Sequence, residues 1–258
     1  GLRFVDGTGR VVKNGGRVMK NVTGYDLVKL LAGSEGRLGV LSELSFRLQP
    51  LPETEVTLVL EGIPARDQAA VMARALTSPW DLSGAASDPA AGGVWRRLEG
   101  VCEQARYRSA KLRERLAHGD VTLMEGAASA ALWADIRDLT PLSGAETVIR
   151  HSARPSHMPG LLEVIAQTAL AQVLSDLGGG WLSVGCRAAD APALLRALQA
   201  RAGVEGGHAR LLKAPSDLPE GLALRQPEDP VTARLSAAIA AKYDPKGLFA
   251  PDTPPPKA

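Results

Sequence analysis

The sequence contains 258 residues, of which 45% are hydrophobic and 22% charged, and its formal net charge is +2. That length suggests one large or two small domains, and the composition is ordinary for a globular protein. Charges of both signs are interspersed, only 4% of the residues are aromatic, and no apolar run approaches about 18 residues, so neither a nucleic-acid partner nor a transmembrane segment is expected.

The first fifty residues are rich in glycine and predict short elements joined by tight turns. Asp6-Gly7 between two apolar runs is typical of a hairpin, because glycine adopts a positive φ without strain. A short helix is expected at Asp26–Leu31, with Asp26 as its N-cap and Gly33 beyond its C-terminus, where many helices end in a left-handed residue. Strands are expected at Leu2–Val5, Arg10–Lys13 and Leu38–Leu48.

After Pro50-Leu51-Pro52, which marks a boundary, short β-branched runs alternate with Ala-rich amphipathic segments. Strands are expected at Glu55–Glu61, Gly93–Glu99, Val121–Glu125, Thr147–His151, Trp181–Arg187 and His208–Lys213. Helices are expected at Arg66–Leu76, Cys102–Ala117, Ser129–Leu139, Pro159–Leu174, Ala191–Ala202 and Pro230–Lys242. This alternation indicates one or two α/β plaits, whose antiparallel or mixed sheet is covered on one face.

The segment from Gly15 to Val40 carries the most chemical information. Glycines at 33, 36 and 39 recur at every third position, and such loops let backbone N–H groups approach a ligand closely. The spacing is neither a dinucleotide-binding GxGxxG motif nor a phosphate-binding P-loop. From spacing alone, a ligand loop and a set of purely structural turns both remain open.

The same segment resembles a known family. Lys20–Leu27 and Leu30–Val40 closely resemble the second half of the FAD domain in vanillyl-alcohol-oxidase-type (PCMH-type) FAD-linked oxidases. Further motifs are similar, in the same order, to the FAD-binding subunits of bacterial glycolate oxidase. These later motifs are Val94–Gly100, Leu132–Arg137, Gly206–Ala209 and Tyr243–Phe249.

The resemblance implies an α+β protein in three parts. Residues 1–52 are expected to be the C-terminal part of a PCMH-type FAD-binding domain, and residues 53–250 a ferredoxin-like α/β substrate and docking domain. Residues 251–258 are expected to be a Pro-rich tail. By position, the resemblance implies that Lys20, Asn21, Gly24, Tyr25 and Asp26 lie along the flavin. It implies contacts with the ribityl and adenosine parts from Gly33, Ser34, Glu35, Gly36, Gly39 and Val40.

Two departures from the family pattern bear on cofactor binding. The chain begins inside the FAD domain, so the resemblance implies that the loop that cradles the pyrophosphate is supplied by another segment. Ala250-Pro251-Asp252 stands where relatives carry Asn-Pro-Gly, which removes an amide expected near the flavin. For this chain alone we expect weak or no FAD retention, and either a long disordered stretch or exposed apolar surface around residues 1–50, because half a domain cannot cover its own core.

Several polar residues outside the glycine segment are candidates for chemistry. His208 is a possible proton acceptor, and the alternative is a histidine satisfied within its loop. Arg150 and Arg154 could anchor a carboxylate, and the alternative is a pair of solvated charges. His151 and His157 have no acidic neighbour at ligand spacing, so no metal site is expected.

Two hypotheses for function follow. The first is an FAD-dependent oxidoreductase subunit that oxidises a small 2-hydroxy acid such as glycolate, with hydride passing to the flavin and electrons passing on to partner subunits of a complex. The second is a non-catalytic α/β module that has lost FAD and binds partners.

Cys102 and Cys186 are far apart and outside any CxxC spacing, which is compatible with a reducing cytoplasm.

Overall fold

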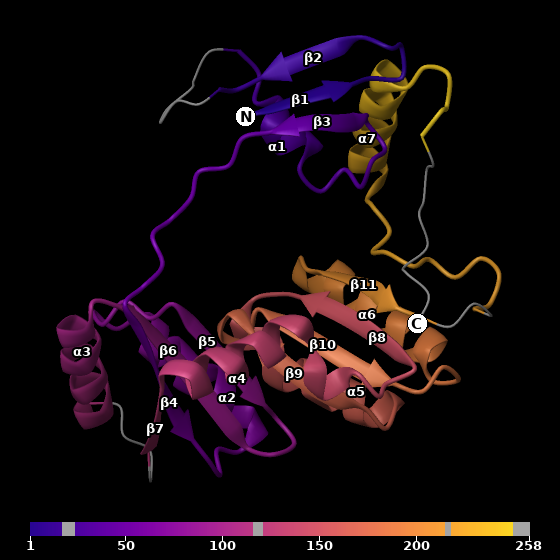
Figure 1. Ribbon diagram of the computed structural model, residues 1–258. Helices are drawn as coiled ribbons and strands as arrows, with labels where there is room; N and C mark the ends of the chain where they lie inside the picture. The colour runs from indigo at the N-terminus through magenta and orange to yellow at the C-terminus, as the bar shows by residue number, and fades with distance from the viewer. Residues whose placement is uncertain (17–23, 116–120, 215–217, 250–258) are drawn as a thin grey trace. The chain divides into compact units, whose positions relative to one another are not determined.

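The computed structural model describes residues 1–16, 24–115, 121–214 and 218–249 (Figure 1). The chain forms two compact units, which are treated separately. The first contains Gly1–Pro50 and the described residues from Glu228 onward, and the second contains Leu51–Pro227. The Pro-rich tail expected at residues 251–258 lies outside the described residues.

A three-stranded antiparallel sheet forms the centre of the first unit. Its order is β2-β1-β3, so β1 is central and β3 is an edge strand. The elements are β1 (Leu2–Val5), β2 (Val11–Asn14), α1 (Leu27–Leu31) and β3 (Val40–Leu44). Leu2 and Phe4 of β1 pack with Leu31 and Leu38 in a small buried cluster. The strand expected at Leu38–Leu48 is shorter in the structure, where it covers Val40–Leu44.

Helix α7 (Pro230–Tyr243) also belongs to the first unit, whereas the sequence expectation placed this helix in the 53–250 domain. The ring of Tyr243 lies 6.0 Å from that of Phe4, and the carbonyl of Tyr243 accepts a hydrogen bond of 2.7 Å from the N–H of Gly7. The helix is joined to the hairpin by these contacts, which link residues far apart in the sequence.

The second unit contains two βαββαβ repeats. The first repeat consists of β4 (Thr54–Leu60), α2 (Ala65–Leu76), β5 (Gly84–Asp88), β6 (Gly93–Gly100), α3 (Cys102–Arg115) and β7 (Val121–Glu125). The second consists of β8 (Thr147–Ser152), α5 (Met158–Thr168), β9 (Gln172–Asp176), β10 (Trp181–Cys186), α6 (Ala191–Glu205) and β11 (His208–Lys213). Helix α4 (Gly126–Asp138) connects the repeats, and the short 3-10 helices are η1 (Thr140–Leu142), η2 (Pro155–His157) and η3 (Leu177–Gly179).

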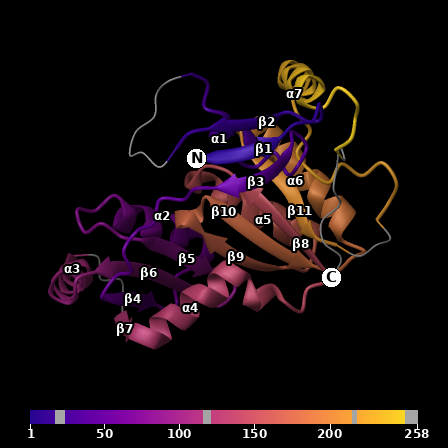
Figure 2. The ribbon, with the colours of Figure 1, turned by 45° about the horizontal axis from the view of Figure 1, so that its top comes forward.

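The two repeats share one antiparallel sheet of eight strands, in the order β11-β8-β10-β9-β5-β6-β4-β7 (Figure 2). Each half of this order follows the 4-1-3-2 arrangement of a ferredoxin-like plait. The halves meet where Ser87 of β5 pairs with Ser175 of β9. The expected α+β fold with ferredoxin-like plaits is confirmed.

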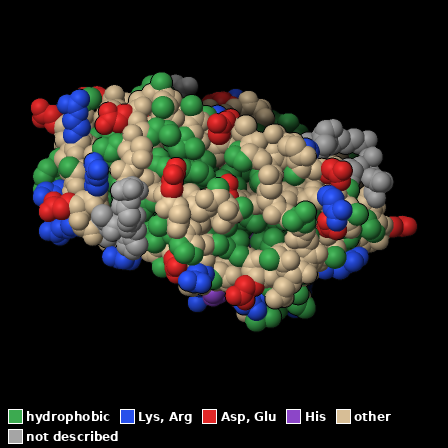
Figure 3. All heavy atoms as spheres, turned by 90° about the horizontal axis from the view of Figure 1, so that it is seen from below, with side chains coloured by type: hydrophobic (Ala, Val, Ile, Leu, Met, Phe, Trp, Pro, Cys, Tyr) green, Lys and Arg blue, Asp and Glu red, His purple; other side chains and the backbone are tan. Residues whose placement is uncertain are grey.

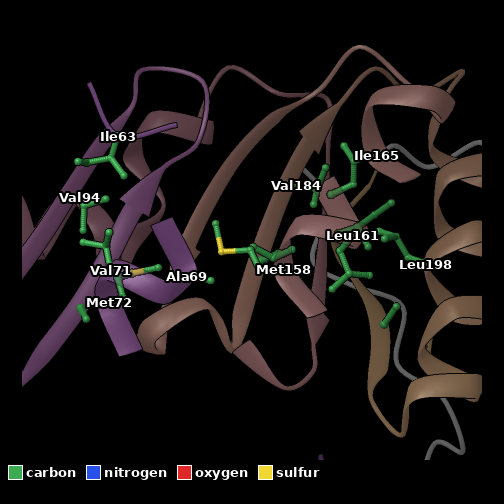
Figure 4. Packing of buried hydrophobic residues seen from close by; sticks show 14 of the residues in the cluster. Ile63, Ala69, Val71, Met72, Val94, Met158, Leu161, Ile165, Val184 and Leu198 are labelled. Carbon is green, nitrogen blue, oxygen red and sulfur yellow. The ribbon is translucent and has the colours of Figure 1, made fainter. Parts of the chain in front are cut away.

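Side chains of the sheet alternate between two different apolar clusters. The larger cluster lies under α2, α3, α5 and α6, and the smaller lies under α4 on the other face. Ala85 belongs to the first cluster and its neighbour Ala86 to the second. Figure 4 shows the fully buried Met158 between Ala69 of the first repeat and Leu161 of the second, so one core spans both repeats.

Two strands were missed in the sequence. β5 has the sequence Gly-Ala-Ala-Ser-Asp, which carries no β-branched or aromatic residue. The helix expected at Pro159–Leu174 ends at Thr168, and Gln172–Asp176 forms β9. Both strands lie in the middle of the sheet, where small buried residues allow close packing against covering side chains.

The charged side chains follow the pattern expected from the sequence. On the face shown in Figure 3, Lys and Arg side chains alternate with Asp and Glu side chains over the described residues. Within the described part of the chain, no helix combines the length and the apolar character that crossing a membrane requires.

Candidate functional site

The glycine-rich segment of the first unit is held in place by two side chains at the start of α1. The Asn14 side chain donates to the Tyr25 carbonyl at 3.0 Å and accepts from the N–H of Leu27 at 3.1 Å. Asp26 caps α1 by accepting from the N–H of Lys29 at 3.1 Å, as the sequence predicted. Hydrogen bonding from Lys29 lowers the pKa of the Asp26 carboxyl. The start of the loop is thus fixed, while the Tyr25 ring is 89% exposed.

The loop after α1 contains glycines of two kinds. A Cβ on Gly39 would lie 2.8 Å from both Phe4 Cδ2 and the Val5 carbonyl oxygen, so the packing of β1 excludes a larger residue there. Gly33 and Gly36 have φ angles of 81° and 82°, yet a Cβ on either would meet no atom within 4 Å. Their backbone therefore lies open on one side, and the N–H of Gly36 donates to none of the described residues.

Strand β3 and the residues that follow it present exposed apolar side chains. Val40 is 59% exposed, and Leu41, Leu44, Phe46 and Leu48 are exposed as well. β3 pairs only with β1 among the described strands, so its outer edge is free. Exposed apolar side chains, one of the two alternatives expected around residues 1–50, are therefore present.

A second candidate site lies wholly in the second unit, in a cavity of about 470 Å³ on the face of the sheet that carries α4. We call it the sheet trough. It crosses the sheet from β8 to β6, is also lined by Glu55 of the next strand, β4, and has one face of α4 as a wall. Its lining comprises Glu55, Ser83, Gly84, Arg97, Ala130, Trp133, Ala134, Ile136, Arg137, Leu139, Arg150, Leu174, Asp176, Leu177, Trp181 and Ser183.

One end of the sheet trough carries an arginine, Arg150, that forms no ion pair with a described residue, although Asp176 also lines the trough. The guanidinium of Arg150 stacks 4.5 Å from the ring centroid of Trp181 and donates a long hydrogen bond of 3.4 Å to Ser183 Oγ. Within the described chain, no carboxylate lies at ion-pair distance from it. Burial, and then the charge of neighbouring Arg210, lower the pKa of Arg150, and the carboxylate of Asp176 partly opposes this shift. This end therefore favours an anion.

The other end of the trough is electrically balanced. Arg97 lies 4.7 Å from the centroid of Trp133, donates to Ser83 Oγ at 3.2 Å and forms an ion pair of 3.4 Å with Glu99. Trp133 is itself fixed, because its Nε1 donates to Thr57 Oγ1 at 2.8 Å. This end of the trough is rigid, and its cation already has an anionic partner.

The structure separates the two arginines proposed as carboxylate anchors. Arg150 lines the sheet trough, but Arg154 is exposed at the N-cap of η2 and does not line it. His208 is exposed at the start of β11, where it pairs with Ser152. Because side chains alternate along a strand, His208 lies on the same face of the sheet as Arg210 and Arg150, although outside the trough.

Two further described histidines lie outside the trough. His151 is fully buried, and desolvation lowers its pKa to about 4. His157 Nδ1 lies 3.2 Å from Glu205 Oε2. No group of three or more metal-ligating side chains occurs among the residues that the structure describes. Of the expected flavin contacts, Lys20 and Asn21 lie outside the described residues.

Sequence reasoning missed most of the trough. Trp133 is buried, whereas Trp181 is 37% exposed, and both line the trough. Trp181 and Ser183 are two positions apart on a predicted strand, which indicates that both side chains lie on the same face of the sheet. Pairing of that strand with Arg150 of β8 could not be read from local sequence.

Comparisons with known proteins were made on both sequence and structure. No model of a known protein family matches the chain. Glycolate oxidase subunit GlcE of Escherichia coli K12 is 40% identical over 100 residues, which cover 39% of this chain and 28% of that protein. Glycolate oxidase subunit GlcD of Bacillus subtilis 168 is 46% identical over 70 residues, which cover 26% of this chain and 15% of that protein.

The fold has relatives among solved structures. The structure of 4-ethylphenol oxidase from Gulosibacter chungangensis matches 96% of this chain and 64% of its own, with a TM-score of 0.64 and 11% identity. That likeness shows a shared fold. The sequence matches to the glycolate oxidase subunits cover less than a third of either relative. The chain is therefore similar in sequence to parts of glycolate oxidase subunits and similar in fold to an FAD-linked oxidase-type structure, and it spans only part of the length of each.

Proposed function

We propose that this chain forms part of the flavin site and the substrate-binding face of an FAD-linked 2-hydroxy acid dehydrogenase of the glycolate oxidase type. The observation that carries the proposal is the half-buried Arg150, which opens into a cavity without a carboxylate partner. A partly buried cation of this kind favours a carboxylate ligand. The names of the sequence relatives, which are glycolate oxidase subunits, support the same substrate class.

The described part of the glycine segment fits a flavin nucleotide. Gly33 and Gly36 leave open space where side chains would stand, and the loop between them is tethered by α1 and β3. When bound, FAD supplies the acceptor for the hydride that leaves the hydroxyl-bearing carbon of the substrate. The residues proposed to hold it are Gly24, Tyr25, Asp26, Gly33, Ser34, Glu35, Gly36, Gly39 and Val40, together with Lys20 and Asn21.

The chain's own residues orient the acid. Arg150, held over Trp181, binds the carboxylate, and Arg210 beside it adds positive charge. The anchoring role considered for two arginines is proposed for Arg150 alone, because Arg154 does not line the trough. His208 is exposed on the same sheet face and is proposed to accept the hydroxyl proton at one of its ring nitrogens.

Partners and compartment belong to the same proposal. The free edge and apolar side chains of β3 suit a further segment of an FAD domain, carried by the same protein or by a partner subunit of a glycolate oxidase-type complex. The cytoplasm is the proposed location, because neither Cys102 nor Cys186 forms a disulfide.

The test is reconstitution with an N-terminal FAD-domain segment taken from a relative. The expected result is a bound-flavin absorbance spectrum that is bleached by a 2-hydroxy acid under anaerobic conditions. Arg150→Met should retain the flavin spectrum and raise the KM for the acid by at least tenfold, and Arg154→Met should change it by less than twofold. A complex that stays colourless at saturating FAD would refute the proposal and favour the non-catalytic module.

A further inference from the structure

We infer that the sheet trough takes a 2-hydroxy acid with one carboxylate and an extended apolar side chain, in preference to glycolate. This inference rests on the proposed function, because it takes Arg150 as the carboxylate anchor. It goes further by assigning the rest of the trough to the substrate's side chain.

The size of the trough is the first argument. Its volume of about 470 Å³ lies within the range of roughly 300–1,000 Å³ that is typical of sites for ligands much larger than a two-carbon acid. It extends from β8, which carries Arg150, past β10, β9 and β5 to β6. Four steps between neighbouring strands correspond to about 19 Å. A carboxylate held at Arg150 therefore leaves most of the trough to the remainder of the molecule.

Apart from Asp176 of β9, most of the surface between the two ends is apolar. Leu174 of β9 and Gly84 of β5 line the trough from the sheet, and Ala130, Ala134 and Ile136 line it from α4. Ala130 and Ala134 are one turn apart, so both project from the same face of the helix. Small side chains there leave width for a chain of methylene groups, and apolar contact makes its burial favourable.

The charges specify a single carboxylate. Arg150 is the cation without an ion-pair partner among the described residues, although Asp176 also lines the trough and acts on its charge. Arg97 at the other end is already paired with Glu99 and hydrogen-bonded to Ser83, and Arg137 is paired with Asp138. Glu55 also lines that far end. A second carboxylate on the ligand would meet Glu55 and a satisfied arginine, so a dicarboxylate is disfavoured against a monocarboxylate with an apolar end.

Binding can be tested without catalysis on the full chain as it stands. The probes are the non-oxidisable acids acetate, butanoate, hexanoate and octanoate, measured by titration calorimetry. Each buried methylene should tighten binding by about three- to fourfold. The expected result is that octanoate binds at least tenfold more tightly than butanoate, while octanol, which lacks the carboxylate, binds at least tenfold more weakly than octanoate.

Two variants and a matched control locate the binding. Ala134→Phe fills the middle of the trough, so it should abolish the dependence on chain length. Ala131→Phe introduces the same ring at an exposed position of α4 that does not line the trough, so it should behave as the parent. Arg150→Met should reduce octanoate affinity to that of octanol. Affinity for octanoate that survives both Ala134→Phe and Arg150→Met would overturn the inference, as would equal affinity for all four acids.

The two proposals fail in different ways. In the reconstituted flavoprotein, reduction by glycolate at a rate equal to or greater than that by 2-hydroxyoctanoate would overturn the inference and leave the proposed function intact. Octanoate binding that depends on Arg150 and Ala134, in a protein that never binds FAD, would refute the proposed function while supporting the assignment of the trough's ligand class.

Discussion

Gly84 provides a sharp test of how the sheet trough is built. Its φ angle is not in the left-handed region, so alanine meets no backbone strain there. The obstacle is Trp133, because a Cβ on Gly84 would lie 2.8 Å from Cη2 and 2.9 Å from Cζ3 of its indole ring. The indole has little freedom to move, since Thr57 holds its nitrogen and Arg97 stacks against the ring.

The expected cost of Gly84→Ala follows from these contacts. Overpacking a filled core costs about 1–3 kcal/mol, and a displaced indole also weakens a buried hydrogen bond worth about 0.5–1.5 kcal/mol. Replacing glycine restricts the unfolded chain and returns about 0.4–1 kcal/mol. We therefore expect the free energy of unfolding of the second unit to fall by about 1–3 kcal/mol.

The assay is urea denaturation followed by circular dichroism, with Gly144→Ala as the matched control. A Cβ on Gly144 would meet no atom within 4 Å, and its φ is not in the left-handed region. The control should be neutral or slightly stabilising. If Gly84→Ala is as stable as Gly144→Ala, the Trp133 indole does not pack tightly against Gly84, and the inference that this end of the trough is rigid is wrong.

Three other outcomes follow from the structure. Burial lowers the pKa of His151 to about 4 in the folded state, so between that pH and about 6.5 only the unfolded state binds the proton. The free energy of unfolding should therefore fall by about 2–3 kcal/mol between pH 7.5 and 4.5. His151→Leu should flatten this pH dependence, measured by urea denaturation. Met158→Ala should cost about 2–5 kcal/mol in calorimetry, because the side chain is fully buried between the repeats, and a smaller loss would show that this site can collapse. Tyr243→Ala removes the ring contact with Phe4, so it should raise the amide hydrogen-exchange rates in α7 and at Gly7, whose N–H donates to the Tyr243 carbonyl. Unchanged exchange rates would show that this ring contact does not hold the helix in place.

The sequence predicted strongly local features well. The hairpin around Asp6, the N-cap at Asp26 and most strands of the second unit were found, because turn residues, caps and alternating β-branched residues act within a few positions. β5 was missed because its residues are small rather than β-branched, and its strand conformation is imposed by β6 and β9 on either side. The resemblance of the glycine segment to FAD-linked oxidases was also present in the sequence.

The candidate site was only partly predictable. Arg150 and Arg154 look equivalent in the sequence, since both flank His151 at the end of a strand. Strand alternation directs Arg150 to the α4 face, whereas the chain leaves β8 before Arg154 and exposes it on a loop. The partial exposure of Trp181 could not be predicted from local sequence, because burial depends on which helices cover which face of the sheet, and distant segments decide that.

The sequence by itself determined the succession of strands and helices and the family to which the glycine segment points, because backbone propensity, capping and turn chemistry are local. Only the tertiary structure decided that two plaits join through β5 and β9, that α7 returns to the first unit, and that one sheet face holds an unpaired arginine above an apolar trough. These features arise from strand pairing and packing between residues far apart in the chain. A local sequence pattern does not specify which distant strand a segment pairs with, or in which register.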